Sequence, residues 1–452
     1  MKAQKSGIFL FAVVLVLISS SVGCAGTPAA SKTPTTLKEA YKDYFKIGVA
    51  INRLVTTGRT DVEADNANRT PEQLVKDIAI VKEQFNAIVN ENDLKPILIH
   101  PNPGPEGYVW EFGDAFVKFG EDNDMYVTGH TLLWHSQVPN WFFEGTETEE
   151  ETSAILNLNQ VFGQVAPEAP QAGARGTRGA RGARGTRGVR GGAGGGMFGG
   201  FGRGNMGPRA TREELIERMR EHIHSVVGRY KGKVKVWDVV NEAIGDGGST
   251  YRSTQWVQII GEDFIPMAFK FAHEADPDAI LRYNDYGLEG RDRREKLKKI
   301  VQAIRDAGAP IHAIGTQTHI NANTTFKQMD ETLTDLETLG LPIHVTELDM
   351  NVSMGGQRGT GANLADNAAA TSGGLISQAD LQQSKAYAEL FKALIKHKDS
   401  VDLVVFWGVC DAVSWRRNGS PLLFDGEDNK KPSFDAVMKV AIEAKENNYY
   451  QD

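Results

Sequence analysis

Two glutamates, Glu242 and Glu347, stand out because each comes at or near the end of an apolar run typical of a buried β-strand. Glu242 follows Trp237-Asp238-Val239-Val240-Asn241, and Glu347 lies in Ile343–Leu348. Two carboxylates that bracket a cleft are what glycoside hydrolysis requires, because one protonates the leaving oxygen while the other attacks the anomeric carbon or activates water. The sequence does not give the distance between them, so retention and inversion of configuration both remain open here.

The elements that must position these glutamates repeat along the chain. Short apolar or β-branched runs alternate with stretches of helical spacing, which predicts βα units and a parallel sheet. The expected strands are Phe45–Asn52, Asn86–Asn90, Met125–Trp134, Val234–Asn241, Ile280–Asp285, Ala313–His319, Ile343–Leu348 and Val401–Gly408. The expected helices are Pro71–Gln84, Thr211–Tyr230, Asp263–Glu274, Arg291–Ala307, Phe326–Leu339 and Gln378–His397. The pattern predicts an α/β fold, a (β/α)8 TIM barrel over residues 37–445.

In such a barrel the carboxyl ends of the strands form the active face. Alternation along the fourth expected strand would place Asp238, Val240 and Glu242 on one face and direct Glu242 inward. Polar or aromatic groups end seven of the eight strands, which favours a site over isolated turn caps: Asn90-Glu91-Asn92, His130 to His135, Asn241-Glu242, Asn284-Asp285, Gln317 with His319, Glu347, and Trp407.

Other residues suit a carbohydrate cleft. Trp134, Trp407 and Trp415 lie at strand ends or in adjacent loops, where indole rings can stack on sugars. His319 is placed to hydrogen-bond the carboxylate of Glu347. Metal binding is a competing use of the histidines, but they do not form a clean ligand pattern. His130 and His135 would face opposite sides of a strand, so we expect neither a metal nor a cofactor.

Taken together, the motifs resemble glycoside hydrolase family 10, the xylanase family, from about Leu37 to Val437. The matching motifs are Asn90-Glu91-Asn92 with Lys95, Gly129-His130-Thr131-Leu132-Leu133-Trp134-His135-Ser136-Gln137, Trp237-Asp238-Val239-Val240-Asn241-Glu242-Ala243, Gly315-Thr316-Gln317-Thr318-His319, Thr346-Glu347-Leu348-Asp349, and Trp407-Gly408-Val409 with Ser414-Trp415-Arg416.

The resemblance implies a retaining endo-1,4-β-xylanase without a cofactor. Glu242 would be the acid/base, Glu347 the nucleophile, and Asn241 the partner of the sugar 2-hydroxyl. Xylan or xylo-oligosaccharides would be the substrate. The further residues expected to bind substrate, on the glycone side of the cleaved bond, are Glu91, Asn92, Lys95, His130, Trp134, Gln137, Gln317, His319, Trp407 and Trp415.

The sequence departs from the family pattern at two positions, and two alternative functions remain open. Pro96 directly follows Lys95, where the family usually has an aromatic residue, and Cys410 stands where a small polar residue is expected. The alternatives are another retaining hydrolase of the same barrel clan, such as a cellulase, and a non-catalytic carbohydrate-binding protein. In this resemblance Trp415 is the steric stop that would distinguish xylose from glucose.

The N-terminal residues have the layout of an export signal. Lys2 and Lys5 precede the apolar run Ile8 to Ile18, and residues 1–23 are predicted to be a signal peptide. Cys24 follows Ser21-Val22-Gly23, which resembles a bacterial lipobox and predicts lipidation of Cys24 as the mature N-terminus, with a linker over residues 24–36. We therefore expect an exported protein, either a lipoprotein of the cell envelope, at the outer membrane or cell surface, or a secreted one. Cys410 is the only other cysteine, so a disulfide framework is not expected.

Two low-complexity segments interrupt the expected barrel, after its third and seventh strands. Residues 163–209 are rich in Arg and Gly, with repeated Gly-Ala-Arg and Gly-Thr-Arg triplets, and are predicted to be a disordered insertion. Residues 353–376 are predicted to be a long loop. Because the Arg-rich segment carries positive charge within a chain of net charge -8, the remainder is acidic, and nucleic acid is not an expected partner. We expect a monomer.

Overall fold

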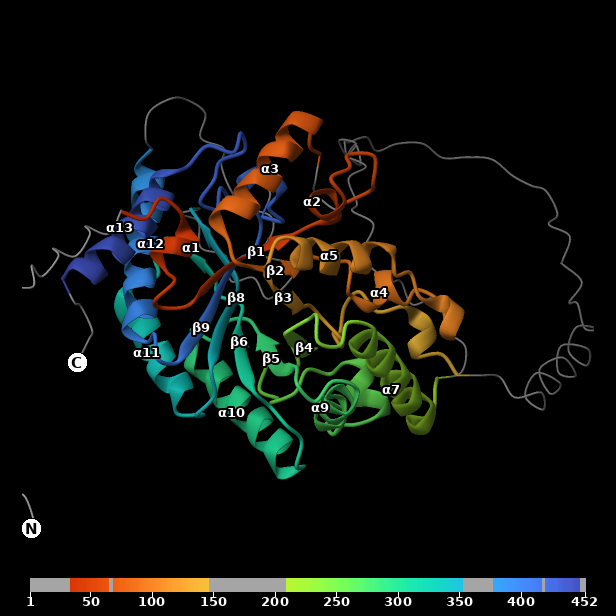
Figure 1. Cartoon of the computed structure of the whole chain (residues 1–452). Coiled ribbons are helices and arrows are strands. Elements are labelled where there is room, and N and C mark those ends of the chain that lie inside the picture. Colours follow the sequence, from red (N-terminus) through yellow and green to blue (C-terminus); the bar gives the residue numbers. More distant parts are fainter. Residues whose placement is uncertain (1–32, 65–67, 146–208, 353–376, 417–418, 448–452) are drawn as a thin grey trace, which may run out of the picture. The chain divides into compact units, whose positions relative to one another are not determined.

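Eight parallel strands close into a (β/α)8 barrel in the computed structural model, as the repeated pattern predicted (Figure 1). Neighbouring strands follow the order β6-β5-β4-β3-β2-β1-β9-β8, and pairing of β6 with β8 closes the ring. A short ninth strand, β7, pairs only with the outer end of β8. The strands are β1 (Lys46–Ile51), β2 (Ala87–Asn90), β3 (Tyr126–Gly129), β4 (Val236–Asn241), β5 (Ile280–Asp285), β6 (Ala313–Thr316), β7 (His319–Asn321), β8 (Ile343–Asn351) and β9 (Val401–Phe406).

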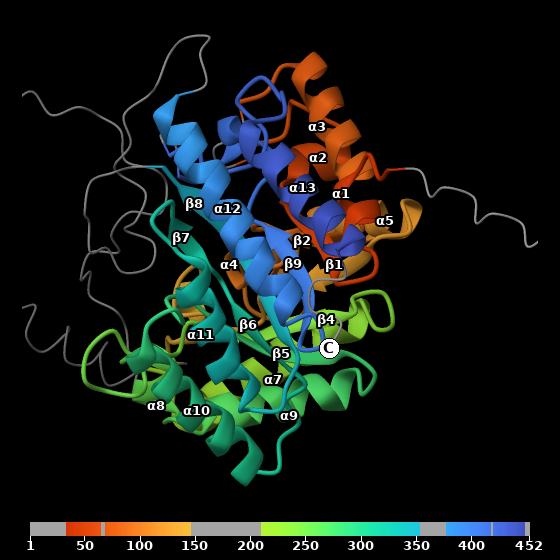
Figure 2. The ribbon, with the colours of Figure 1, turned by 90° about the vertical axis from the view of Figure 1, so that its left-hand side faces the viewer.

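Helices surround the strands (Figure 2). All six predicted helices are present, with ends within two residues of the expected ones. Thr70, Thr211 and Ser377 each begin a helix with a capping box, which satisfies backbone N–H groups of the first turn. The helices are α1 (Leu37–Ala40), α2 (Arg53–Thr57), α3 (Pro71–Gln84), α4 (Pro96–Ile99), α5 (Glu111–Asp122), α7 (Arg212–Arg229), α8 (Gln255–Ile259), α9 (Phe264–Ala275), α10 (Arg291–Asp306), α11 (Phe326–Glu337), α12 (Gln378–Lys396) and α13 (Pro432–Glu446), with 3-10 turns at Pro105–Gly107, Asn140–Phe142 and Asp411–Val413.

The structure describes residues 33–64, 68–145, 209–352, 377–416 and 419–447, and residues 34–452 form one unit. The predicted signal peptide and Cys24 lie outside the described residues, as do residues 353–376 and nearly all of residues 163–209. Glu144 and Arg209, the last residue of the Arg-rich segment, pair in an antiparallel β-bridge. In the described part of the chain, no helix has the length and apolar character needed to span a bilayer.

Six helices in the described part of the chain were not predicted: the short helices α1, α2, α4 and α8, of four or five residues each, and the longer helices α5 and α13. α5 shows why a longer helix can escape prediction. It contains Gly113 and Gly120, and glycine weakens a helical pattern. A Cβ at Gly113 would lie 2.5 Å from the hydroxyl of Tyr230, and one at Gly120 would lie 2.3 Å from Cγ2 of Val127 on β3. The glycines therefore let α5 approach its neighbours closely. The same glycines weaken the pattern of residues from which a helix is predicted.

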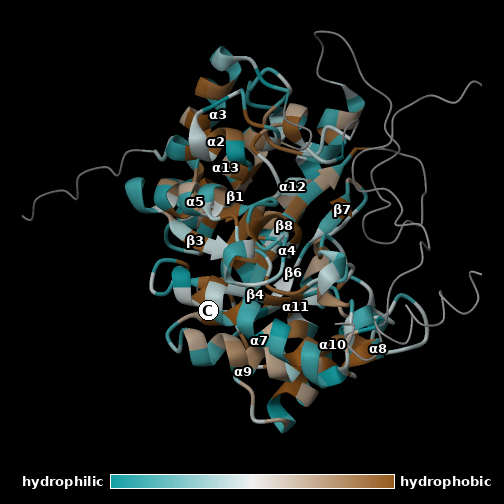
Figure 3. Ribbon diagram, turned by 90° about the vertical axis from the view of Figure 1, so that its right-hand side faces the viewer, coloured by the Kyte–Doolittle hydropathy of each residue, from teal (hydrophilic) through white to brown (hydrophobic). Residues whose placement is uncertain are grey.

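The buried apolar residues form two clusters. Hydrophobic residues lie both on the strands and on the helices around them (Figure 3). The larger cluster joins the outward residues of the strands to the helices, and it includes Ile47, Val49 and Ile51 of β1. A smaller cluster contains the alternate residue of the same strand, Ala50, together with residues of β2 and β9. The alternation places this smaller cluster inside the barrel.

A charged pair fills another part of the barrel interior. Asp238 of β4 accepts hydrogen bonds from Nε and Nη2 of Arg282 on β5, at 2.7 and 2.9 Å, and both residues are 1% exposed. Burial raises the pKa of Asp238, but Arg282 outweighs it and holds the pKa at about 2. Nη1 of Arg282 also lies 3.0 Å from Nδ1 of His344 on β8. The pair thus ties three strands together.

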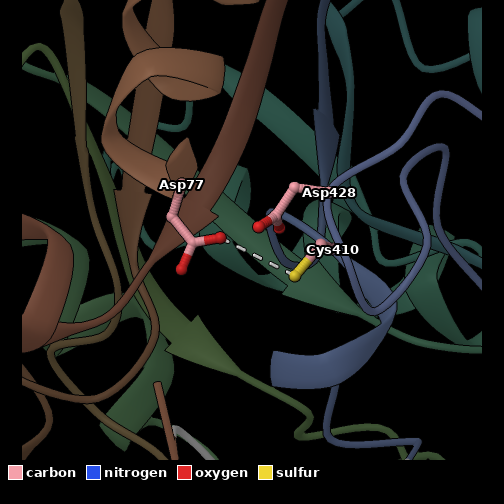
Figure 4. Close-up of side chains that lie close together, drawn as sticks. All are labelled: Asp77, Cys410 and Asp428. Carbon is pink, nitrogen blue, oxygen red and sulfur yellow. Dashed lines mark hydrogen bonds between the residues drawn. The ribbon is translucent and has the colours of Figure 1, made fainter. Parts of the chain in front are cut away.

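Cys410 belongs to a second buried charged cluster, at the join between the N-terminal and C-terminal parts of the barrel (Figure 4). Its thiol donates to Oδ1 of Asp77 on α3, and Asp428 lies beside them, with possible ligand atoms within 4.8 Å of one another. Arg69 already supplies a cation here, because its Nη2 is 2.6 Å from Asp77 Oδ1 and 2.5 Å from Asp428 Oδ1. We interpret this cluster as a structural ion-pair cluster, with Cys410 as a buried member.

Replacing Arg69 with methionine is expected to lower the free energy of unfolding by roughly 3–5 kcal/mol, because it leaves two buried carboxylates without their cation. Urea unfolding of the variant and wild type measures this. Arg59→Met is the matched control: its partner Asp61 is 72% exposed and Arg59 itself 51%, so the expected loss is below about 1 kcal/mol. Equal losses in the two variants would contradict a structural role for the Arg69 cluster.

Candidate active site

Glu242 and Glu347 are both buried at the carboxyl ends of barrel strands. Glu242 directly follows β4, and Glu347 is the middle residue of β8, just beyond the residues that pair with β6. The two residues come from strands on different parts of the ring, so their side chains meet across its mouth rather than along one strand. The expectation that the barrel would bring them to one face is therefore confirmed.

The orientation of Glu242 does not follow from alternation along β4, so that prediction was wrong. The register between β4 and β5 shifts between Asp238 and Val240, so simple alternation does not hold along this strand. Val240 packs in the cluster that joins strands to helices, whereas Asp238 lies in the barrel interior. Glu242 turns into the mouth through a left-handed backbone conformation, with φ of 57°.

A chain of side-chain amides links the two carboxylates. Nε2 of Gln317 donates to Glu242 Oε1 at 3.0 Å and approaches Oδ1 of Asn241 at 3.3 Å. Nδ2 of Asn284 donates to the same Asn241 oxygen at 2.9 Å and to Glu347 Oε1 at 2.8 Å. All these residues are buried. The carboxylates therefore have their positions set relative to each other by hydrogen bonds from β4, β5 and the loop after β6.

The environment of Glu242 favours its protonated form. Burial raises its pKa, and the nearby carboxylates of Asp285 and Glu347 raise it further, against the hydrogen bond from Gln317. Nδ1 of His135 lies 3.8 Å from Glu242 Oε2. Burial lowers the pKa of His135 to about 4, so this neighbour is neutral at pH 7.

Glu347 has a cationic neighbour instead. Nε2 of His319 donates to Glu347 Oε2 at 3.2 Å, as the sequence predicted, and its Nδ1 lies 3.0 Å from Asp349 Oδ2. Burial alone would lower the pKa of His319, but Asp349 and Glu347 raise it to about 9. Parallel pairing of β7 with β8 sets this contact, because His319 is the register partner of Asp349. The indole of Trp415 donates to Asp349 Oδ2 at 2.7 Å and so joins the same group.

Three of the other predicted substrate-binding residues form a polar group beside a fourth, Trp134. Nζ of Lys95 donates to Asn92 Oδ1 at 2.9 Å and lies 4.9 Å from the centre of the Trp134 ring. Nε2 of Gln137 reaches the same Asn92 oxygen at 3.4 Å. Pro96, the departure noted in the sequence, is the first residue of α4, so it follows Lys95 without displacing it from this group.

Glu91 directly precedes Asn92 in the loop after β2, where its backbone N–H donates to Ile51 O. His130 and Trp407 lie in edge-to-face contact, with ring centres 5.3 Å apart. Nδ1 of His130 is 3.0 Å from Asp238 Oδ2, so the interior ion pair fixes the ring of His130. Glu91, His130 and Trp407 thus lie in the loops after β2, β3 and β9, respectively.

The third strand is shorter than predicted, and this changes where His130 and His135 lie. β3 ends at Gly129, so His130 and His135 lie in a loop rather than on a strand. Both therefore reach the mouth, His130 towards Asp238 and His135 towards Glu242. The expectation that they face opposite sides was wrong because it assumed strand geometry as far as Trp134.

Sequence reasoning did not include three residues that contact the predicted site residues: Asn284, His135 and Asp349. Asn284 and Asp285 had been recognised as a polar strand end, and that signal was sufficient to include Asn284. His135 and Asp349 lie within the matched motifs. The register that places Asp349 opposite His319 could be found only from the structure.

A parallel barrel with two buried carboxylates at its mouth, one beside a cation and one with a raised pKa, is the arrangement of a glycoside hydrolase. The model of the family described as "Glycosyl hydrolase family 10" matches residues 36–165 and 204–440. The chain belongs to glycosyl hydrolase family 10.

Relatives named as xylanases match most of the chain. The "Beta-1,4-xylanase" of Dictyoglomus thermophilum is 32% identical over 443 residues, covering 95% of this chain and 98% of that protein. The "Endo-1,4-beta-xylanase A" of a Caldicellulosiruptor species is 32% identical, covering 93% of this chain and 50% of its own length. The chain thus spans about half the length of that curated relative. "Exoglucanase XynX" of Acetivibrio thermocellus is 31% identical and is covered over 29% of its length.

Solved structures agree with this assignment. A family 10 endoxylanase retrieved from a sugarcane soil metagenome is similar with a TM-score of 0.68 and 29% identity, covering 89% of this chain and 99% of that one. A xylanase of Thermoanaerobacterium saccharolyticum in complex with xylotetraose is similar with a TM-score of 0.64 and 30% identity, covering 89% of this chain and 97% of the other.

Proposed function

We propose that this chain is an endo-1,4-β-xylanase that hydrolyses internal bonds of xylan with retention of anomeric configuration. In this proposal Glu242 is the acid/base and Glu347 the nucleophile. The names of the relatives and the xylotetraose complex of a similar structure support the substrate class. Membership of the family supports the retaining mechanism.

The contrast between the two carboxylates is the observation that carries the assignment of roles. A general acid needs a raised pKa, whereas a nucleophile must be ionised at the working pH. Burial raises the pKa of Glu242, which retains a proton to donate to the leaving oxygen. His319 supplies a positive charge beside Glu347, which suits attack on the anomeric carbon and formation of the glycosyl-enzyme intermediate. In the second step Glu242 accepts a proton from the incoming water.

The remaining predicted residues are proposed to bind the sugar units. Asn241 would contact the 2-hydroxyl of the sugar at the cleaved bond, since its amide lies between the two carboxylates. Asn92, Lys95 and Gln137 form a polar group on one side of the mouth, where hydroxyl groups of the glycone can replace their mutual hydrogen bonds. The other proposed contacts are Glu91, His130, Trp134, Gln317, His319, Trp407 and Trp415.

A glucan-cleaving enzyme is the second candidate, because one relative is named as an exoglucanase. Comparing reducing-sugar release from glucuronoxylan and carboxymethylcellulose separates the two. We expect release from xylan and little from the cellulose derivative. Proton NMR of the first products should show the β-anomer. Preference for the cellulose derivative would refute the substrate, and initial α-anomer would refute the mechanism.

We also propose that the protein is exported as a lipid-anchored monomer of the cell envelope. The apolar run Ile8 to Ile18 and Cys24 after a small residue support this proposal. Metabolic labelling with a fatty-acid analogue in a bacterial host, for wild type and Cys24→Ser, tests the anchor. Label that persists in Cys24→Ser would refute lipidation at this residue.

A further inference from the structure

Glu242 has a backbone conformation that L-residues with long side chains rarely adopt, and this requires an explanation. Its φ of 57° lies in the left-handed region. Such a residue persists only where the surrounding structure holds it, and such positions gather at active sites. The contacts of residues 242–244 show what holds it.

Three consecutive backbone N–H groups are anchored on β5. The N–H of Glu242 donates to the carbonyl of Asn284 at 2.9 Å. The N–H of Ala243 donates to the hydroxyl of Tyr283 at 3.0 Å, and the N–H of Ile244 donates to Asp285 Oδ2 at 3.1 Å. Two of these three acceptors are side-chain atoms, so they depend on residue identity and not only on the strand.

The carbonyl side is held by Arg252. Its Nε donates to Glu242 O at 2.9 Å, and its backbone N–H donates to Ala243 O at 2.7 Å. The guanidinium is itself held, because Nη1 donates to Asp246 Oδ2 and Nη2 donates to the hydroxyl of Tyr286, each at 2.7 Å. The peptide groups around Glu242 are therefore fixed from both sides.

Tyr283 and Asp285 support each other beneath this turn. The hydroxyl of Tyr283 donates to Asp285 Oδ2 at 2.6 Å while accepting from Ala243. Asp285 Oδ1 accepts from Nη2 of Arg293 at 2.6 Å. Both Tyr283 and Asp285 are 0% exposed. Tyr283 also packs in the cluster between strands and helices, on the face of β5 opposite to the barrel interior.

Asn284 contacts both glutamates, but the anchors from Tyr283, Asp285 and Arg252 hold only the turn that carries Glu242. Glu347 is held by the side chains of Asn284 and His319, neither of which bonds to the hydroxyl of Tyr283. Loss of that hydroxyl would leave the buried N–H of Ala243 without its acceptor and would free the turn that directs Glu242. Proton transfer depends on a well-placed acid, so it would weaken while attack by Glu347 is retained.

We propose that Tyr283, with Asp285 and Arg252, is a positioning residue that holds Glu242 in its left-handed conformation and so directs the acid/base carboxyl at the leaving-group oxygen. This inference rests on the proposed function. It requires that removing an anchor impair the acid step more than the nucleophilic step.

The test compares Tyr283→Phe with wild type on two aryl β-xylobiosides that share a glycone. Phenol is a poor leaving group that needs protonation, whereas dinitrophenol leaves without help from an acid. We expect kcat/KM for the phenyl substrate to fall about 10- to 100-fold, within the range that general acids contribute, and that for the dinitrophenyl substrate to fall less than about threefold. Arg252→Met, which alters a partly exposed side chain, should show the same selective loss even if Tyr283→Phe folds poorly.

Tyr41→Phe is the matched control. Its buried hydroxyl donates to Val437 O at 2.7 Å, near the amino end of β1 and away from Glu242. We expect it to leave the ratio of the two substrates unchanged. Equal losses on both substrates in Tyr283→Phe and Arg252→Met, or no loss at all, would overturn the positioning role. A wild type that cleaves aryl cellobiosides but not xylobiosides would refute the proposed substrate instead, and the same ratio would then be measured on cellobiosides.

Discussion

Glu347→Ala is expected to reduce xylan hydrolysis by more than about 10⁴-fold, the largest loss from any single replacement in this chain. A covalent route accounts for much of the acceleration by a retaining glycosidase, and the variant has no group to form the glycosyl-enzyme bond. Reducing-sugar release from glucuronoxylan at matched protein concentration measures the loss. The effect should be similar on activated aryl xylobiosides, because attack fails whatever group leaves.

Rescue by azide and a control variant distinguish loss of the nucleophile from a general loss of activity. Added azide can enter the space left by the carboxylate and attack the anomeric carbon directly, so the expected product is the α-glycosyl azide. Glu331→Ala, at an exposed residue of α11, is the control and should retain wild-type activity. Substantial residual hydrolysis by Glu347→Ala, or a β-glycosyl azide, would assign the nucleophile to another residue.

Glu242→Ala is expected to lower kcat/KM on xylan by about 10²- to 10⁴-fold, the usual contribution of a general acid. The loss should be much smaller on a dinitrophenyl xylobioside, whose leaving group needs no proton. With that substrate the glycosyl-enzyme intermediate should accumulate, since no base activates water in the second step. Azide should then speed turnover and yield the β-glycosyl azide. Equal losses on both substrates would remove Glu242 from the acid role.

The same prediction has a pH signature. Glu242 must be protonated to act as the acid, and burial raises its pKa. Activity of the wild type should therefore persist above the ordinary range of a glutamic acid and fall as the pH rises through the raised pKa. The residual xylan hydrolysis by Glu242→Ala should lack this alkaline limb. An unchanged alkaline limb in the variant would show that another group controls it.

Most of the barrel could be predicted because local pattern and tertiary fold agree there. α3 begins and ends as expected, since Thr70, Pro71 and Gln73 form a strong start signal and the helix has a clear periodicity. α5 could not be predicted, because Gly113 and Gly120 serve contacts with Tyr230 and Val127 that lie far away in sequence. Glycines chosen for close packing weaken the very pattern from which a helix is predicted.

The site shows a similar division. The two glutamates were found as ends of apolar runs, a signal that survives without knowledge of contacts. The orientation of Glu242 was argued from alternation, yet it depends on a register shift in β4 and on a left-handed φ. Neither has a signature in the six residues of the strand, because both are imposed by partners on β5. The link between His319 and Asp349 likewise depends on the pairing of β7 with β8.

The bridge between Glu144 and Arg209 has a consequence for how the chain tolerates the Arg-rich segment. The backbone on either side of that segment is already brought together, with Ala210 N–H donating to Phe143 O at 3.0 Å. The entropy of closing a loop grows only with the logarithm of its length, so halving an inserted segment that made no contacts would change the free energy of folding by only about 0.6 kcal/mol. With its two ends joined in this way, an inserted segment without contacts of its own could lengthen or shorten over evolutionary time at almost no thermodynamic cost to the barrel.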